Sequence, residues 1–391
     1  MLNQLNRCFI CLPAGNKLLL LLVSCIFIFM KKVLIVVGTR PNFIKVTQFK
    51  KLVEAYPSVD LRIVHTGQHF DAKMADVFFQ QLALSPDFFL NIPVGSPTSQ
   101  MAEIMVRLEK LIVESFRPDI LLVVGDVNST LAAAITANKL GITLGHIESG
   151  LRSKDRTMPE EINRILTDEI SDLFFVTEKS GVDNLLNEGK AKAKIHFVGN
   201  TMIDTLVAFE KEITRSDILE TYSLKEREYV LMTMHRPATV DNEAGLAKLM
   251  ELIESITKSY TLIFPIHPRT LKKLGEYHLL DGFNRNKKVI VTDPLDYFSF
   301  QKLIKHSKFI LTDSGGIQEE STFMRVPCIT LRPNTERPVT CEIGSNSLLS
   351  FETEKILAVI KEIENGTYKK GLVPEYWDGS STNRILEIIS K

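Results

Sequence analysis

Short apolar runs alternate with amphipathic stretches along the chain from residue 32 onward. In the first half of the chain, the runs predict strands at 33–37, 61–65, 120–124, 143–147, 173–176 and 195–198. Between them, apolar residues at helical spacing predict helices at 44–56, 72–81, 100–116 and 129–139. Because strands that alternate with helices usually pair in parallel, we expect a sheet covered by helices on both faces.

The same alternation restarts in the second half, with strands predicted at 229–234, 261–266, 289–291, 309–312 and 328–331. We therefore expect an α/β protein with two doubly wound, Rossmann-like domains. The predicted N-terminal domain spans 30–200 and the C-terminal domain spans 201–375, while residues 376–391 form a helix that packs back on the first domain. In such folds ligands bind outside the carboxyl ends of the strands, so we expect the site in the inter-domain cleft.

Residues 1–29 do not fit either predicted domain. An apolar run at 18–30 follows Lys17 and is too short to span a bilayer comfortably as a helix. A buried strand is predicted directly after it. We interpret residues 1–29 as an extension upstream of the true start at Met30, with a membrane anchor and a signal peptide as the alternatives.

Charge and cysteine usage exclude several classes of function. The chain has 47 basic and 47 acidic residues, interspersed and without a basic tract, which argues against bulk nucleic-acid binding. Its five cysteines show no zinc-ligand spacing. We therefore expect reduced thiols in a cytoplasmic protein, with no metal site, and any anionic ligand must be held by local groups.

The segment from Asp313 to Glu320 is the most informative motif. A predicted strand leads into Ser314, Gly315 and Gly316, and a predicted helix follows. Such a turn lets backbone N–H groups approach a phosphate, and the helix N-terminus adds partial positive charge. Glu320, further along this helix, is placed to accept hydrogen bonds from ribose hydroxyls. The motif favours a nucleotide or nucleotide-sugar ligand over a simple tight turn.

Other polar residues follow the predicted strands of the first domain. Arg40 and Lys45 follow the first strand, where both could face a pyrophosphate. Asp126 and Glu148 end two later strands, and Glu160 begins a helix. Because three carboxylates near one cleft repel each other, we expect at least one raised pKa and an acid/base pair. The neighbouring Glu161 is interpreted as a stabilising acid in the first turn of the helix.

In the second domain, His235 and Arg236 end one predicted strand, and His267 ends the next. Two histidines that each lie near an arginine at a strand end indicate a cavity that binds an anion. Their spacing does not match that of metal ligands.

The chain resembles the non-hydrolysing UDP-N-acetylglucosamine 2-epimerases from about Lys32 to its C-terminus. The shared motifs are Gly38-Thr39-Arg40-Pro41, His65-Thr66-Gly67-Gln68-His69, Gly125-Asp126, His146-Ile147-Glu148-Ser149-Gly150-Leu151-Arg152, Met158-Pro159-Glu160-Glu161-Ile162-Asn163-Arg164, Gly199-Asn200-Thr201, His235-Arg236, Asp313-Ser314-Gly315-Gly316-Ile317-Gln318-Glu319-Glu320 and Thr335-Glu336-Arg337-Pro338. The resemblance implies a glycosyltransferase-B-like fold and a homodimer. It also implies interconversion of UDP-GlcNAc and UDP-ManNAc through 2-acetamidoglucal, without a nicotinamide or metal cofactor.

The resemblance also implies a role for each matching residue. The diphosphate is expected to be bound by Arg40, Lys45, Ser314, Gly315 and Gly316. Glu320 is expected to bind the ribose, Phe300 to lie near the uracil, and Arg337 to contact the nucleotide side of the cleft. Proton transfer or positioning of the sugar is expected of Asp126, Glu148, Glu160 and His235.

One departure concerns regulation. Regulated bacterial members bind a second, allosteric UDP-GlcNAc with residues that match Gln68, His69, Arg236 and His267, but this chain has Phe70 where those members tend to carry arginine. We expect activation by UDP-GlcNAc to be weak or absent.

Three alternatives to a UDP-GlcNAc epimerase remain open. Some motifs also resemble epimerases of a UDP-diacetamido-glucuronate. A glycosyltransferase of the same fold would share the UDP site but would need an acceptor groove. A protein that only binds the nucleotide sugar would not need the carboxylates.

Overall fold

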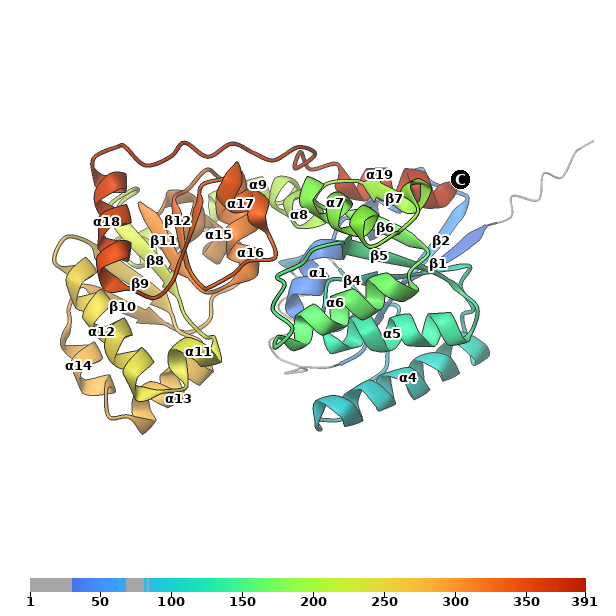
Figure 1. The fold of residues 1–391 in the computed structure, drawn as a ribbon, viewed down its shortest axis with the longest axis horizontal. Helices are drawn as coiled ribbons and strands as arrows, with labels where there is room; N and C mark the ends of the chain where they lie inside the picture. The colour runs from blue at the N-terminus through green and yellow to red at the C-terminus, as the bar shows by residue number, and fades with distance from the viewer. Residues whose placement is uncertain (1–29, 68–80, 83) are drawn as a thin grey trace, which may run out of the picture.

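The computed structural model describes residues 30–67, 81–82 and 84–391. It contains two parallel sheets, one of seven strands and one of six, in two domains that lie side by side (Figure 1). The predicted fold class, two doubly wound Rossmann-like domains, is confirmed. The segment at 1–29, most of the helix predicted at 72–81, and Gln68, His69 and Phe70 lie outside the described residues.

The N-terminal sheet has the order β3-β2-β1-β4-β5-β6-β7, and its strands pair in parallel. The strands are β1 (Lys31–Val37), β2 (Val59–His65), β3 (Phe88–Phe89), β4 (Ile120–Val124), β5 (Thr143–Ser149), β6 (Leu173–Val176) and β7 (Ile195–Phe197). The α-helices around it are α1 (Arg40–Val46), α2 (Phe49–Leu52), α4 (Pro97–Glu114), α5 (Asn128–Lys139), α6 (Pro159–Ile170) and α7 (Lys179–Asn187), with 3₁₀ turns η1 (Val53–Ala55) and η2 (Lys192–Lys194). All the predicted strands form, and β3, only two residues long, adds an edge that the apolar pattern did not predict.

The helix predicted at 44–56 is instead divided into α1, α2 and η1. Thr205 Oγ1 donates to the carbonyl oxygen of Ile44 at 2.5 Å. In a continuous helix that carbonyl would accept from the backbone N–H of Gln48. A contact from a residue far along the chain therefore interrupts the helix, which no local pattern could indicate.

The C-terminal sheet has the order β10-β9-β8-β11-β12-β13, and its strands also pair in parallel. The strands are β8 (Tyr229–Thr233), β9 (Thr261–Pro265), β10 (Val289–Thr292), β11 (Phe309–Thr312), β12 (Cys328–Leu331) and β13 (Asn346–Leu349). The helices are α11 (Pro237–Val240), α12 (Glu243–Thr257), α13 (Pro268–Glu276), α14 (Leu280–Arg285), α15 (Tyr297–His306), α16 (Gly315–Phe323), α17 (Pro338–Glu342) and α18 (Thr353–Glu364). Strand β13 was not predicted because half of its residues are polar.

The chain passes between the domains twice. After β7 it forms α8 (Thr201–Ala208), α9 (Glu210–Arg215) and α10 (Ile218–Thr221), and after α18 it returns to form α19 (Ser381–Ser390), which lies over the N-terminal domain (Figure 1). Asp204 of α8 accepts the backbone N–H groups of Ser381 at 3.1 Å and Thr382 at 2.5 Å, which ties the start of α19 to α8. Trp377 and Ile385 are buried in the core of the N-terminal domain.

The topology places a binding site between the sheets. Strand order reverses between β1 and β4 in one sheet and between β8 and β11 in the other. At such a switch point the following loops diverge and leave a crevice at the carboxyl ends of the strands. Among the described helices, none is both long and apolar enough to cross a membrane.

Candidate active site

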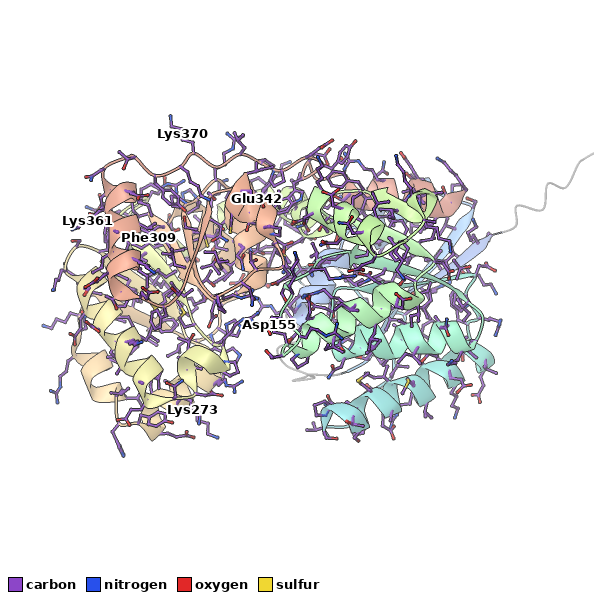
Figure 2. All side chains as sticks on the ribbon, viewed as in Figure 1. Asp155, Lys273, Phe309, Glu342, Lys361 and Lys370 are labelled. Carbon is purple, nitrogen blue, oxygen red and sulfur yellow. The ribbon has the colours of Figure 1, made fainter. Side chains whose placement is uncertain are left out.

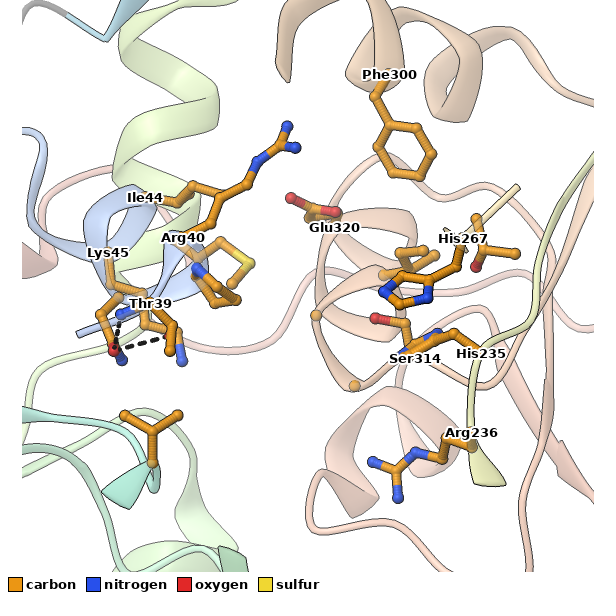
Figure 3. Close-up of a pocket in the computed structure, with 18 of the residues that line it drawn as sticks. Thr39, Arg40, Ile44, Lys45, His235, Arg236, His267, Phe300, Ser314 and Glu320 are labelled. Atoms are coloured by element: carbon orange, nitrogen blue, oxygen red, sulfur yellow. Dashed lines mark hydrogen bonds between the residues drawn. The ribbon is translucent and has the colours of Figure 1, made fainter. Parts of the chain in front are cut away.

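A cleft of about 460 Å³ lies between the two domains. Most of the predicted site residues line it, namely Arg40, Lys45, Asp126, Glu160, His235, Arg236, His267, Phe300, Ser314, Gly315, Gly316, Glu320 and Arg337. Figure 3 shows Arg40 and Lys45 on one side of the gap and His235, Ser314 and Glu320 on the other. Glu148 lies behind Lys45 and is only 5% exposed.

Contacts across the cleft join the two domains. Arg337 of the C-terminal domain forms an ion pair with Glu148 of the N-terminal domain. Asp155, labelled beside the cleft in Figure 2, accepts a hydrogen bond from Asn334 Nδ2 at 3.3 Å. Arg40 Nη2 donates to the carbonyl oxygen of Leu295 at 3.3 Å. These links hold the groups from the two sheets opposite one another.

The N-terminus of α16 opens into the cleft. Ser314 occupies the N-cap position without a side-chain capping bond, and Gly315 begins the helix. A Cβ added at Gly315 would lie 2.9 Å from Glu336 Oε1 and 3.0 Å from Arg337 Nη1. A side chain at this position would therefore force Glu336 and Arg337 to shift. The first N–H groups of a helix have no partners within it, so this end of α16 can bind an anion in the cleft.

The loop after β8 is held by Asp313, whose role the sequence did not reveal. Its Oδ2 accepts the backbone N–H groups of His235 at 2.8 Å and Arg236 at 2.7 Å, while Oδ1 pairs with His235 Nδ1 at 2.8 Å. Burial raises the pKa of Asp313, but the hydrogen bond and charge of His235 outweigh it, and the pKa is lowered overall. The rings of His235 and His267 lie 5.5 Å apart between centroids.

Glu148 occupies a strained position at the end of β5. Its backbone is left-handed, with φ at 73°, and the β5–β6 register shifts between Ile147 and Ser149. A bulge of this kind re-aims a side chain, here toward Lys45 and Arg337, and both form ion pairs with the carboxylate. Burial acts to raise the pKa of Glu148, but these two cations hold it below its ordinary value. Glu148 is therefore not the carboxylate whose pKa crowding raises.

Asp126 lies close to Glu148. It directly follows Gly125, at which an added Cβ would lie 3.4 Å from Glu148 Oε2. Asp126 Oδ2 accepts from Arg164 Nη2 at 2.5 Å, and its side chain is 28% exposed to the cleft. Glu160 is also exposed in the cleft. The structure thus gathers the three predicted carboxylates at one place, in a buried, an intermediate and an exposed setting.

Glu161, in contrast, has structural partners. Its carboxylate accepts from the backbone N–H groups of Ser153 at 2.9 Å and Lys154 at 2.8 Å, and it pairs with Arg164. It is 1% exposed. The interpretation of Glu161 as a stabilising acid therefore agrees with its contacts.

Glu320 faces Arg40 across the cleft (Figure 3). Burial raises the pKa of its carboxyl from 4.5 to about 8, even though Gln301 Nε2 donates to Oε1 at 2.6 Å. Phe300, the predicted uracil contact, lies beside it on α15. A raised carboxyl pKa within the cleft therefore belongs to Glu320, which is predicted to bind ribose and not to transfer protons.

Sequence reasoning also missed Glu319. This carboxylate accepts from Asn200 Nδ2 at 2.8 Å and lies 2.9 Å from Arg337 Nε, so it supports the arginine that pairs with Glu148. Glu319 lies within the motif at the start of α16, but no neighbouring residue in the sequence indicates a partner 119 positions away.

Within the described ranges, no group of three or more His, Cys, Asp or Glu residues is arranged to hold a metal ion. What the cleft offers instead is a helix N-terminus, cations and carboxylates. Together they can bind an anionic leaving group next to residues that are able to exchange protons.

Known proteins resemble the chain over most of its length. A family model described as UDP-N-acetylglucosamine 2-epimerase matches residues 51–390. The UDP-N-acetylglucosamine 2-epimerase of Methanocaldococcus jannaschii is 40% identical over 92% of this chain and 99% of its own length. The UDP-2,3-diacetamido-2,3-dideoxy-D-glucuronate 2-epimerase of Pseudomonas aeruginosa is 36% identical over 92% of this chain and 99% of that protein.

A solved structure supports the same relationship. The crystal structure of the Methanocaldococcus jannaschii enzyme, in complex with UDP-GlcNAc and UDP, gives a TM-score of 0.83 and covers 92% of this chain and 99% of its own. Sequence, fold and the arrangement of the cleft agree. The chain belongs to the UDP-N-acetylglucosamine 2-epimerase family and is an isomerase.

Proposed function

We propose that this enzyme interconverts UDP-GlcNAc and UDP-ManNAc. The observation that carries the proposal is the placement of a phosphate-binding helix end, at Ser314 and Gly315, across one cleft from Asp126 and Glu148. The relative from Methanocaldococcus jannaschii is named for UDP-GlcNAc, and its structure holds UDP-GlcNAc and UDP. These names support the same substrate here.

The C2 proton of the sugar is not acidic enough to leave unaided, so its removal must be coupled to loss of UDP from C1. A carboxylate removes that proton while the C1–O bond breaks, and the products are UDP and 2-acetamidoglucal. UDP then adds back at C1 while C2 receives a proton on its other face. Arg40, Lys45 and the start of α16 stabilise the negative charge that develops on the departing diphosphate.

Asp126 and Glu148 are the proposed proton-transfer groups, and Glu160 and His235 orient the sugar. In the unliganded cleft, Lys45 and Arg337 keep Glu148 ionised and weakly basic. A bound diphosphate competes for both cations. Substrate binding then weakens the two ion pairs and raises the pKa of Glu148, so that this carboxylate becomes a stronger base when a substrate is present.

The test is proton NMR of the enzyme with UDP-GlcNAc in deuterated water, without added metal or nicotinamide. We expect UDP-ManNAc to appear, with deuterium at C2 of both sugars. The Asp126→Asn variant serves as the matched control and is expected to exchange C2 far more slowly. An unchanged spectrum from the unmodified enzyme, with either UDP-GlcNAc or UDP-ManNAc as the starting material, would refute the proposal.

The Pseudomonas aeruginosa relative makes a UDP-diacetamido-glucuronate the second candidate substrate. The same NMR experiment with that nucleotide sugar distinguishes the two, because only the true substrate exchanges at C2. A glycosyltransferase would release UDP only when an acceptor is added.

We further propose a cytoplasmic homodimer that supplies ManNAc for a surface polysaccharide. Light scattering coupled to size-exclusion chromatography tests the dimer. A mass corresponding to one 44.2 kDa chain would contradict it.

A further inference from the structure

Gln301 is a buried residue of α15 that the roles assigned above do not use. It is 1% exposed, and it lines the cleft next to Phe300. Its Nε2 donates to Oε1 of Glu320 at 2.6 Å, while its Oε1 is buried without a hydrogen-bond partner. An amide placed so deeply, with half of its hydrogen-bonding capacity unused, needs a reason other than packing.

The contact with Glu320 supplies that reason. Because Gln301 holds one carboxylate oxygen, the side chain of Glu320 can present the other to the gap. Figure 3 shows Glu320 opposite Arg40. A carboxylate oxygen fixed in this way accepts hydrogen bonds from vicinal hydroxyls of a ribose. Removing the amide would leave the carboxyl free to rotate within the cleft.

The charges around Glu320 explain why it needs this support. Burial disfavours its ionised form, Glu319 on the same helix adds a like charge, and Tyr297 on α15 is a buried neutral phenol. Only the Gln301 hydrogen bond and the Arg40 charge on α1 oppose these effects by favouring the carboxylate.

We propose that Gln301 is a positioning residue for the nucleoside, holding one oxygen of Glu320 so that the other faces the ribose diol of the bound nucleotide. The inference rests on the proposed uridine diphosphate site. It adds a determinant of ribose recognition on α15, the helix that also carries Phe300, the predicted uracil contact.

The first experiment compares the affinities of UDP and 2′,3′-dideoxy-UDP, which lacks the diol. We expect the unmodified enzyme to bind UDP at least tenfold more tightly, and the Gln301→Met variant to reduce this ratio to threefold or less. Misfolding affects both ligands alike, so the ratio survives a partly unfolded variant. Gln48→Met removes another buried amide, one that does not line the cleft, and should leave the ratio unchanged.

The second readout is the pH dependence of UDP affinity between pH 7 and 9.5. Affinity should rise as Glu320 ionises, and in Gln301→Met the midpoint should lie about one pH unit higher because a donor to the carboxylate is lost. Glu320→Gln should remove the response. An unchanged ratio and midpoint in Gln301→Met would overturn the inference, whereas failure of the unmodified enzyme to bind UDP would overturn the proposed function instead.

Discussion

Replacing Glu320 with glutamine should make the C-terminal domain more stable at alkaline pH. Burial raises the pKa of this carboxyl from 4.5 to about 8. The folded protein therefore binds more protons than the unfolded chain between these values. The contribution of this carboxyl to the free energy of unfolding is greatest below pH 4.5 and falls as pH rises, until the folded pKa is passed. At about 1.4 kcal/mol per pH unit, the loss reaches roughly 5 kcal/mol by pH 9.

The neutral amide of Glu320→Gln removes this loss and can still accept the hydrogen bond from Gln301. We expect the variant and the unmodified protein to unfold at similar temperatures at pH 5. At pH 9 the variant should unfold roughly 10–20 °C higher, given a domain of this size. The assay is thermal unfolding without ligand, measured from pH 5 to pH 9. A difference in melting temperature that does not change with pH would refute the reasoning.

Three further predictions concern the diphosphate and proton-transfer groups. Glu148→Gln should bind UDP yet lower kcat by about 10²–10⁴-fold in the C2 exchange assay, and near-normal exchange would show that Glu148 carries no proton. In the unmodified enzyme, the acid limb of the pH profile of kcat should lie at higher pH than that of kcat/KM, because the bound diphosphate draws Lys45 and Arg337 away from Glu148. Acid limbs at the same pH would show that substrate binding does not weaken these ion pairs. Gly315→Ala places a Cβ 2.9 Å from Glu336 Oε1. The variant should bind UDP roughly tenfold more weakly, or worse, as measured by calorimetric titration. Binding equal to that of the unmodified enzyme would mean that the helix end does not hold the diphosphate.

The sequence predicted the strands best where apolar runs are continuous. Strands such as β4 and β11 were found within their observed bounds because both are buried along their whole length. Strands β3 and β13 were missed because one has two residues and the other is half polar. The break after α1 was missed because its cause, Thr205, lies in another part of the chain.

The site followed the same rule. Asp126 and Ser314 could be placed in one cleft because each directly follows a predicted strand, and the topology brings those strand ends together. The partners of a residue were harder to predict. At least one carboxylate among Asp126, Glu148 and Glu160 was expected to have a raised pKa, but Glu148 pairs with two cations from different domains that lower its pKa. Gln301 carries no motif, and its contact with Glu320 becomes visible only once α15 and α16 pack together.

The return of the chain to its starting domain has a consequence for folding during synthesis. Domains commonly fold one after another as they leave the ribosome, with the N-terminal domain first. Here the core of the N-terminal domain includes Trp377, Ile385 and Ile389, which follow the whole C-terminal domain in the chain. The first domain cannot complete its core until the C-terminal domain has been synthesised. A premature stop that removes only α19 would therefore damage the domain that is synthesised earliest.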